Sequence, residues 1–424
     1  MMGGLPAAAS WQENCEVRGL VHFSAERRGV QGKAMPENMD PFASDFAVLL
    51  CKSAGTFTAG LGKGRMSAAS LRAADRGTAW ETGAMKDGMN HVERFRAVMD
   101  FQPVDRLPMW EWAMWWDETI ARWRNEGLPA GLESVFDIAQ FFGLDPYQQF
   151  WFSTTDPTIA AVQHHVEGIV ANMDDYLRVR PQLFPDHGAA IAAMAPWAER
   201  QARGEAVVWI TLEGYFWFPR TLMGFTQISL AFYDQPELIH RINADLTEFN
   251  LRVLDRVLEV CVPTFATIAE DMSYNHGPML SERHFDEFIA PYYRRLVPRL
   301  LERNILPIVD TDGDVTRLAP WLLREGVCGV LPLERQAGVN GMQLRQQFPQ
   351  LRMIGHYNKM AMNRGEAAVR AEFERLLPLM RSGGFIPSVD HQTPPGVSLD
   401  EYRVYLRLLK EYVETASGLA AAAP

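Results

Sequence analysis

"ILPIVDTDGDVTRLAPWLLREGVCGVLPLE", residues 305–334, contains a complete strand–helix–strand unit, and its pattern decides the fold class. The apolar run over 305–309 predicts a short buried strand that ends at Asp310. Apolar residues at helical spacing follow over 315–326, and 328–334 reads as a second strand. Parallel strands need a long crossover connection, usually a helix. The stretch therefore predicts one unit of a parallel sheet.

The same alternation continues on both sides of this unit. Further strands are predicted at 106–112, 205–214, 264–271, 351–356 and 384–390. Helices are predicted at 89–102, 116–127, 134–143, 236–261, 281–304, 341–348, 366–383 and from Ser398 onward, where Glu401 completes a capping box. Seven or eight such units in about 300 residues predict a single (β/α)8 TIM barrel. A doubly wound sheet is the alternative, but no glycine-rich turn follows the first strand, which disfavours its nucleotide-binding form.

Composition narrows the class of function. The chain has 424 residues and is 47% hydrophobic, which is enough for a large core. It carries 52 acidic and 41 basic residues, a net charge of -11 that argues against binding nucleic acid or an anionic membrane. No apolar run is long enough to span a bilayer, and the N-terminus is a poor signal peptide. The four cysteines are scattered without a CxxC, so we expect a cytoplasmic protein with reduced thiols.

The chain divides into three parts by composition. Residues 1–88 are rich in Ala, Gly and Ser with weak periodicity, so we expect a low-order extension that contributes little to the fold. The barrel is expected over 89–416, and 417–424 is expected to be a disordered tail. A second interpretation is that translation starts at Met89.

Polar residues fall repeatedly at the predicted strand ends. The C-terminal ends of the strands carry the chemistry in a (β/α)8 barrel. The residues at those positions are Glu111, Glu213, Glu270, Asp271, Asp310, Asp312, Glu334, His356, Asp390 and His391. This recurrence predicts an active site at the mouth of the barrel.

The segment "DTDGDV" needs its own explanation. An EF-hand loop would have Gly at its sixth position and Glu at its twelfth, where this chain has Val315 and Trp321. A turn in which Asp314 caps the next helix is simpler, but it does not account for Asp310. A carboxylate at that depth needs a cation, a basic partner or a proton. A divalent metal held by Asp310, Asp312 and a histidine is one solution, and a cationic substrate group is another.

Histidines and aromatic residues supply the remaining candidates. His391 follows a predicted strand and is the best histidine ligand, although a hydrogen-bonded structural histidine is an equal alternative, and His356 has weaker support. Aromatic residues gather at 110–116 and at 215–218. They fit either the core or an apolar pocket for a flat or methylated ligand.

Three segments resemble the uroporphyrinogen decarboxylase superfamily. They are "MNHVERFRAVMDFQPVDRLPMWEW", "AEDMSYNHGPMLSERHFDEFIAPYYRRL" and "GGFIPSVDHQTPPGVSLDEYRVYLRLL". The resemblance runs from about Met89 to Val413 and implies a (β/α)8 barrel. It also implies either porphyrinogen decarboxylation or methyl transfer from a corrinoid to an acceptor such as coenzyme M.

The chain departs from both branches of that superfamily. Decarboxylases carry an arginine-rich "RQAGR" after the first strand, whereas this chain has "MWEWAMWW", which would present Glu111 to a poly-anion. The methyltransferase branch has a His-x-Cys-Gly zinc motif and a later Cys. Here "DTDG" places Asp310 and Asp312 at the His and Cys positions, and His391 matches the third ligand.

The resemblance and the residues together predict a methyltransferase that moves a methyl group between a corrinoid protein and a small acceptor. The corrinoid would arrive on a separate protein, because "DxHxxG" occurs nowhere. A carboxy-lyase and a non-catalytic barrel that binds a corrinoid or partner are the alternatives. The predicted catalytic residues are Asp310, His391 and Glu270; the predicted zinc ligands are Asp310, Asp312 and His391; and the predicted substrate-binding residues are Trp110, Glu111, Trp112, Trp217, Arg220, Asp271 and His356.

Overall fold

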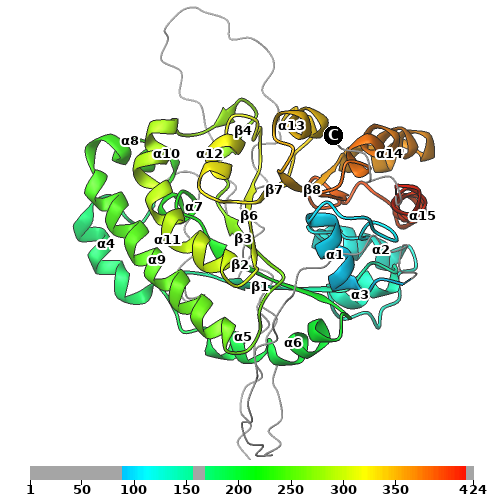
Figure 1. Ribbon diagram of the computed structural model, residues 1–424, viewed down its shortest axis with the longest axis horizontal. Helices are drawn as coiled ribbons and strands as arrows, with labels where there is room; N and C mark the ends of the chain where they lie inside the picture. The colour runs from blue at the N-terminus through cyan, green and yellow to red at the C-terminus, as the bar shows by residue number, and fades with distance from the viewer. Residues whose placement is uncertain (1–87, 156–167, 417–424) are drawn as a thin grey trace, which may run out of the picture. The chain divides into compact units, whose positions relative to one another are not determined.

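Seven parallel strands form one curled sheet in the computed structural model, which describes residues 88–155 and 168–416 (Figure 1). The strands pair in chain order: β1 (Tyr147–Phe152), β2 (Val207–Glu213), β3 (Phe265–Ala269), β6 (Leu306–Thr311), β7 (Gly329–Pro332), β8 (Arg352–Tyr357) and β9 (Phe385–Val389). Strand order that follows chain order is typical of a barrel and excludes the doubly wound alternative, in which the order reverses. The predicted (β/α)8 architecture is confirmed.

The predicted strand at 106–112 is wrong, although its residues lie where the barrel needs them. Pro108 has no N–H, and the Met109 N–H donates to the Asp145 carboxylate at 3.1 Å instead of to a strand. On one side the Tyr147 hydroxyl of β1 donates to the Glu111 carbonyl at 2.5 Å. On the other side the Trp112 N–H donates to Ser388 Oγ of β9 at 3.1 Å. The segment therefore fills the gap between the first and last strands.

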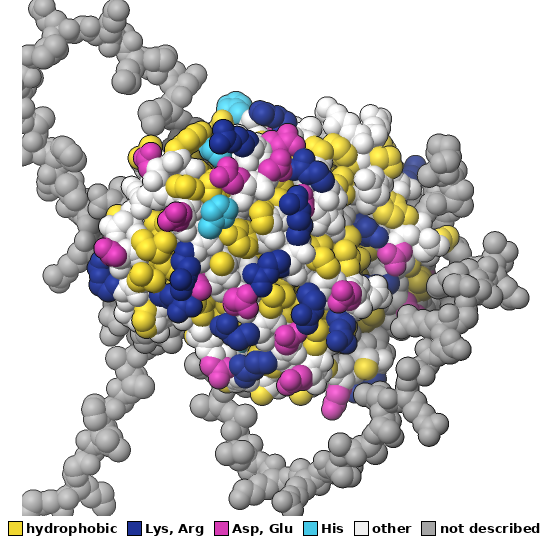
Figure 2. All heavy atoms as spheres, turned by 60° about the vertical axis from the view of Figure 1, so that its left-hand side comes forward, with side chains coloured by type: hydrophobic (Ala, Val, Ile, Leu, Met, Phe, Trp, Pro, Cys, Tyr) yellow, Lys and Arg dark blue, Asp and Glu magenta, His cyan; other side chains and the backbone are white. Residues whose placement is uncertain are grey.

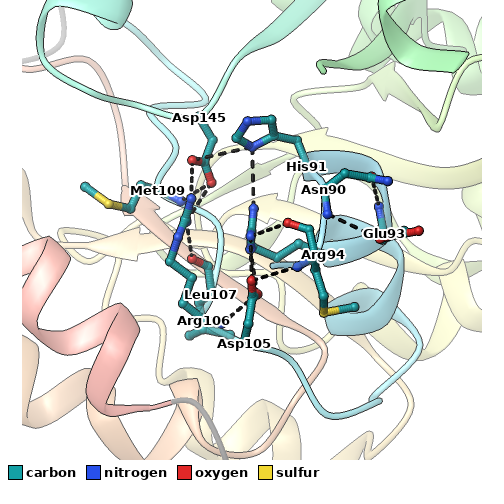
Figure 3. A network of polar contacts seen from close by, with 10 residues as sticks. Asn90, His91, Glu93, Arg94, Asp105, Arg106, Leu107, Met109 and Asp145 are labelled. Carbon is teal, nitrogen blue, oxygen red and sulfur yellow. Dashed lines mark hydrogen bonds and ion pairs between the residues drawn. The ribbon is translucent and has the colours of Figure 1, made fainter. Parts of the chain in front are cut away.

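Buried ion pairs fix the start of this closing segment (Figure 3). Arg94 of α1 (His91–Met99) binds Asp105 at 2.7 Å, and Arg106 binds Asp145 at 2.6 Å. His91 lies 3.6 Å from the same Asp145 carboxylate. Bidentate arginine–carboxylate pairs set orientation as well as distance, so α1 and the segment after it are held in register with β1.

Helices cover the outside of the sheet. They are α2 (Asp117–Asn125), α3 (Val135–Phe141), α4 (Met173–Val179), α5 (Gly188–Ala192), α6 (Ala195–Ala202), α7 (Trp217–Met223), α8 (Phe225–Asp234), α9 (Pro236–Leu258), α10 (Glu282–Phe288), α11 (Ala290–Leu301), α12 (Ala319–Arg324), α13 (Gly341–Gln347), α14 (Glu366–Met380) and α15 (Leu399–Thr415). Two 3-10 segments, η4 (Arg180–Gln182) and η5 (Lys359–Arg364), and the hairpin of β4 (Ser273–Tyr274) and β5 (Gly277–Pro278) complete the order.

The helix ends test two sequence predictions. Ser398 and Glu401 form the predicted capping box, and the predicted apolar face of α15 is buried. Asp314 was predicted to cap α12, and this is wrong, since α12 begins only at Ala319. The Asp314 carboxylate instead accepts from the Thr316 N–H at 2.9 Å in the preceding turn.

Stacked aromatic rings fill the N-terminal end of the barrel. Trp209 stacks on Phe265 with ring centroids 4.8 Å apart, and Phe265 stacks on Phe95 of α1 at 5.1 Å. Trp110 also stacks on Phe95, with ring centroids 5.2 Å apart. Four large rings in contact bury much apolar area and leave the polar strand ends at the opposite side.

The outer surface shown in Figure 2 mixes basic and acidic side chains. Arg295 and Arg299 of α11 pair with Glu248 and Asp255 of α9, each at 2.6 Å. Exposed pairs of this kind contribute little to stability. Within residues 88–155 and 168–416, no helix has the length and apolar character to cross a membrane. Apart from Gly88, the predicted extension and tail lie outside the described residues.

Candidate functional site

The carboxylates of Asp310 and Asp271 are brought together by the pairing of β6 with β3. Asp310 is in register with Ala269 of β3. The N–H groups of Glu270 and Asp271, just after β3, donate to the Asp310 carbonyl of β6 at 2.9 and 3.1 Å, which holds this segment beside the end of β6. These contacts place two acidic residues at neighbouring strand ends, as the sequence predicted.

Four carboxylates interact at this edge of the sheet. Burial, and then the charge of Asp271, raises the pKa of Asp310 to about 8. Burial raises the pKa of Asp312 well above its usual range, and Asp271, Glu334 and Asp310 add to the effect in that order. A carboxyl with a pKa near 8 is mostly protonated at neutral pH, so Asp310 can donate a hydrogen bond or a proton.

Gly313 allows the loop after β6 to pack closely. Its φ of +80° lies in the left-handed region, and its N–H donates to the Glu334 carboxylate at 3.1 Å. A Cβ at this position would lie 2.5 Å from the backbone nitrogen of Tyr274 in β4. Only glycine fits, which explains the Gly in "DTDG".

Asp390, at the end of β9, organises the opposite side of the site. Its carboxylate is fully buried and accepts from the N–H groups of Arg335 and Lys359 at 3.1 and 3.2 Å. The Lys359 ammonium lies 3.9 Å away. Burial, relieved in part by Lys359, raises the pKa of Asp390 to about 6. Lys359 also favours the charged form of Asp312, so it links the two groups of carboxylates.

His391 lies next to this group in the chain. Burial, and then the charge of Lys359, lowers its pKa to about 3. The imidazole is therefore neutral at physiological pH. A neutral imidazole can accept a hydrogen bond or bind a metal, but it is not a ready proton donor.

Arg220, Trp217 and Asp271 form one connected unit. Arg220 of α7 donates to the Asp271 carboxylate at 2.5 Å and to its carbonyl at 3.1 Å. Its guanidinium lies 4.5 Å from the centre of the Trp217 ring. Asp271 has a φ of +40°, a conformation that these two bonds help to hold. Three predicted substrate-binding residues are thus adjacent, and the charge of Arg220 is already neutralised.

Two predicted site residues have mainly structural surroundings. The buried Glu270 carboxylate accepts from the N–H groups of Tyr215 and Phe216, at 2.9 and 2.7 Å, and from the Tyr293 hydroxyl at 2.7 Å. It holds the turn after β2, and the geometry gives no support to a catalytic role.

His356 is equally occupied. Its Nδ1 lies 2.9 Å from the Leu333 carbonyl, and its Nε2 lies 3.0 Å from both the Gly341 nitrogen and Arg375. Burial and the neighbouring Arg375 lower the pKa of His356 to about 3. A neutral ring with both nitrogens engaged joins β8 to α13 and leaves no group for a substrate.

The aromatic candidates at 110–116 divide between the core and the seam of the barrel. Trp110 belongs to the core stack described above. The Trp112 indole N–H donates to the Val389 carbonyl at 2.8 Å. Trp115 is buried among Trp123 and Tyr402, with centroids 5.8 Å away in each case. These contacts favour the core interpretation for this group.

Glu111 is buried in the seam between the closing segment, β9 and α15. Its carboxylate accepts from the Tyr402 hydroxyl at 3.2 Å and from Ser388 Oγ at 3.3 Å. Burial outweighs these bonds and raises the pKa of Glu111 to about 7. The side chain is thus part of the packing between sheet and helix.

Glu111→Gln is expected to stabilise the protein at pH 8 by about 3 kcal/mol, because a shift from 4.5 to about 7 has roughly that cost. The folded pKa lies above the unfolded one, so the native state binds more protons and wild-type stability falls as pH rises from about 4.5 to 7. Denaturant unfolding at pH 4.5 and pH 8 measures the gap, which should vanish at the lower pH. Glu302→Gln, at an exposed site, is the control. Equal stability of Glu111→Gln and wild type at pH 8 would contradict the raised pKa of Glu111.

The predicted zinc site finds no support in the geometry. Among the described residues, no three His, Cys, Asp or Glu side chains are arranged to hold a metal ion. A ready-made zinc site is therefore not formed by Asp310, Asp312 and His391. Structural zinc sites also favour nitrogen and sulfur ligands over two carboxylates. Zinc binding by this trio stays a prediction that elemental analysis can test.

Lys359 is the residue that the sequence analysis missed. It lies three positions after His356, just beyond the end of β8. Its place just beyond the end of β8 is the same strand-end signal that selected the carboxylates.

Two solved structures match this chain at low sequence identity. A protein described as a vitamin-B12-independent methionine synthase from Listeria monocytogenes matches with 11% identity and a TM-score of 0.39, covering 74% of this chain and 98% of that one. The 3-keto-L-gulonate-6-phosphate decarboxylase from Vibrio cholerae matches with 10% identity and a TM-score of 0.28, covering 65% and 100%. A comparison with curated proteins finds no match.

A family model gives the decisive comparison. The model described as uroporphyrinogen decarboxylase (URO-D) matches residues 173–412. That range begins in α4 and ends near the end of α15, so it includes six of the seven strands and every carboxylate of the candidate site. The match covers more than half of the chain, and the chain belongs to the uroporphyrinogen decarboxylase family.

Proposed function

We propose that the protein is a methyltransferase that moves a methyl group between a small molecule and a corrinoid carried by a separate protein. The observation that supports this choice is the charge of the site. Asp271, Asp310, Asp312 and Glu334 act on one another, whereas Arg220 is neutralised by Asp271. Such a site has few free cations for a poly-carboxylate and suits a neutral or cationic methyl donor.

Asp310 has a defined part in the proposed reaction. When the methyl carbon–heteroatom bond of the donor breaks, the heteroatom leaves with the electron pair and needs a proton if the donor is neutral. The protonated Asp310 carboxyl can give that proton, and the heteroatom then departs as the neutral alcohol or amine. The corrinoid supplies the cobalt centre that accepts or donates the methyl group.

A carboxy-lyase is the second candidate, and the same protonated Asp310 favours it. A carboxyl that holds its proton at neutral pH could protonate the carbon left after loss of CO2. The substrate would need fewer carboxylates than a porphyrinogen, since Arg220 at this site is already paired with Asp271.

We expect no turnover of uroporphyrinogen by the purified protein. Arg220 is already paired with Asp271, so the site has few cations to bind this poly-carboxylate, and neither substrate loss nor a copro-type product should be detected by chromatography. The control is an authentic uroporphyrinogen decarboxylase under the same anaerobic conditions. Product formation that depends on Asp310 or His391 would overturn the ranking and promote the decarboxylase.

A further inference from the structure

Lys359 has an unusual environment for a lysine. Its side chain is only 17% exposed, and its backbone is fixed because the Lys359 N–H donates to Asp390 at 3.2 Å. Lysine is almost never buried without a close partner. Here the nearest ion-pair partner is Asp390 Oδ1 at 3.9 Å, which is longer than a charge-assisted hydrogen bond.

The donors of this ammonium are unused in the part of the chain that the structure describes. Within residues 88–155 and 168–416, no group accepts a hydrogen bond from Lys359 Nζ. Asp390 cannot easily move closer, since both of its carboxylate oxygens already accept backbone N–H groups. An ammonium that is largely withdrawn from water and has three N–H donors is prepared for an anionic ligand.

Arg220 shows the contrast. It donates to the Asp271 side chain and backbone and stacks on Trp217, so its charge and its donors are used within the protein. Of these two cations, Lys359 is the one whose side-chain donors make no hydrogen bond within the described residues.

The charges around Lys359 restrict what the ligand can be. The ammonium faces Asp390, and it also acts on Asp312, which in turn lies among Asp271, Glu334 and Asp310. A di- or tri-carboxylate bound to Lys359 would meet these acids. A ligand with one carboxylate for Lys359 and a cationic or hydrogen-bond-donating group for the aspartates matches both sides.

We propose that Lys359 is a specificity-determining residue that binds the single carboxylate of a zwitterionic methyl donor, such as an N-methylated amino acid, with the methylated nitrogen toward Asp310 and Asp312. This inference rests on the proposed function and names its substrate class. It assigns to Lys359 a direct contact with substrate.

Calorimetric binding to the purified full-length protein, without any corrinoid protein, tests the assignment. The ligands are glycine betaine and N,N-dimethylglycine, which carry one carboxylate, and choline, which replaces the carboxylate with a hydroxymethyl group. The two zwitterions should bind wild-type protein about 10- to 100-fold more tightly than choline, the ratio that one charged hydrogen bond gives. Lys359→Met should remove this preference and leave choline affinity unchanged or higher.

Two further variants make the outcome clear. Lys359→Arg keeps the charge and should restore part of the preference, whereas Lys410→Met, at an exposed position on α15, should behave as wild type. Equal binding of choline and the zwitterions, a preference that survives Lys359→Met, or no binding of either zwitterion would each overturn the assignment. Lys359-dependent binding without methyl transfer would contradict the proposed function alone.

Discussion

Asp310→Asn is expected to lower the rate of methyl transfer from a neutral donor by about 100- to 10,000-fold, the contribution typical of a general acid. The amide cannot give up a proton to the leaving heteroatom, although its size and position match those of the protonated carboxyl. The same change should stabilise the folded protein. Burial and the charge of Asp271 raise the pKa of Asp310 from 3.8 to about 8, and the uncharged amide removes the cost of ionising this group.

The sign and size of that stabilisation follow from linkage. The folded pKa exceeds the unfolded one, so wild-type stability falls as pH rises from about 4 to 8, and Asp310→Asn should lack this loss. A shift of this size corresponds to roughly 6 kcal/mol, and the partial exposure of Asp310 reduces the expected gain to a few kcal/mol at pH 9.

Denaturant unfolding at pH 4 and pH 9, with initial rates measured on the same samples, checks both effects. Asp400→Asn, an exposed site on α15, is the matched control. A variant that is less stable than wild type at pH 9, or that keeps its full rate, would contradict the role given to Asp310.

Gly313→Ala is expected to destabilise the protein by about 3–5 kcal/mol and to disrupt the site. The new methyl carbon would lie 2.5 Å from the Tyr274 nitrogen and 2.6 Å from the Ser273 carbonyl carbon, both of them backbone atoms. Overpacking of this kind adds to the cost of a left-handed backbone, which is about 1–2 kcal/mol for a residue other than glycine. The loop that carries Asp312 would have to move away from β4.

Gly338→Ala separates the cost of the left-handed backbone from the cost of overpacking. Gly338 has a φ of +83°, close to that of Gly313, but nothing lies within 4 Å of its Cβ position. Its replacement should therefore cost only the backbone term of about 1–2 kcal/mol. The difference between the two variants in the midpoint of thermal unfolding measures the close approach. Similar midpoints would mean that the loop adapts without strain.

Much of the fold could be predicted from the sequence, because strands buried on both faces read as short apolar runs. The runs that end at Asp310 and Asp390 are examples. The strand at 147–152 was missed, since "YQQFWF" has polar residues in its middle. The segment at 106–112 looked like a strand, yet Pro108 and the carboxylate of Asp145 withdraw its backbone from the sheet. The periodicity of a sequence does not reveal which group accepts the hydrogen bond from a given backbone N–H.

The site could be predicted only in part, for a similar reason. Strand-end position correctly brought together Asp271, Asp310 and Asp312, since parallel strands place their ends at one edge. Position did not separate these from Glu270, whose carboxylate turns back to the N–H groups of the β2 turn. The direction of a side chain depends on partners that are distant in the sequence, and that information appears only in the folded chain.

The most direct test of the proposed function is methyl transfer to a reduced corrinoid protein, followed by corrinoid absorbance. With a mono-carboxylate N-methyl donor and wild-type protein, we expect a donor-dependent conversion of the reduced corrinoid spectrum to the methylated one. Lys359→Met should weaken this conversion, and Lys410→Met should not. An unchanged corrinoid spectrum, together with release of CO2 from a carboxylated substrate, would contradict the methyltransferase and establish the carboxy-lyase.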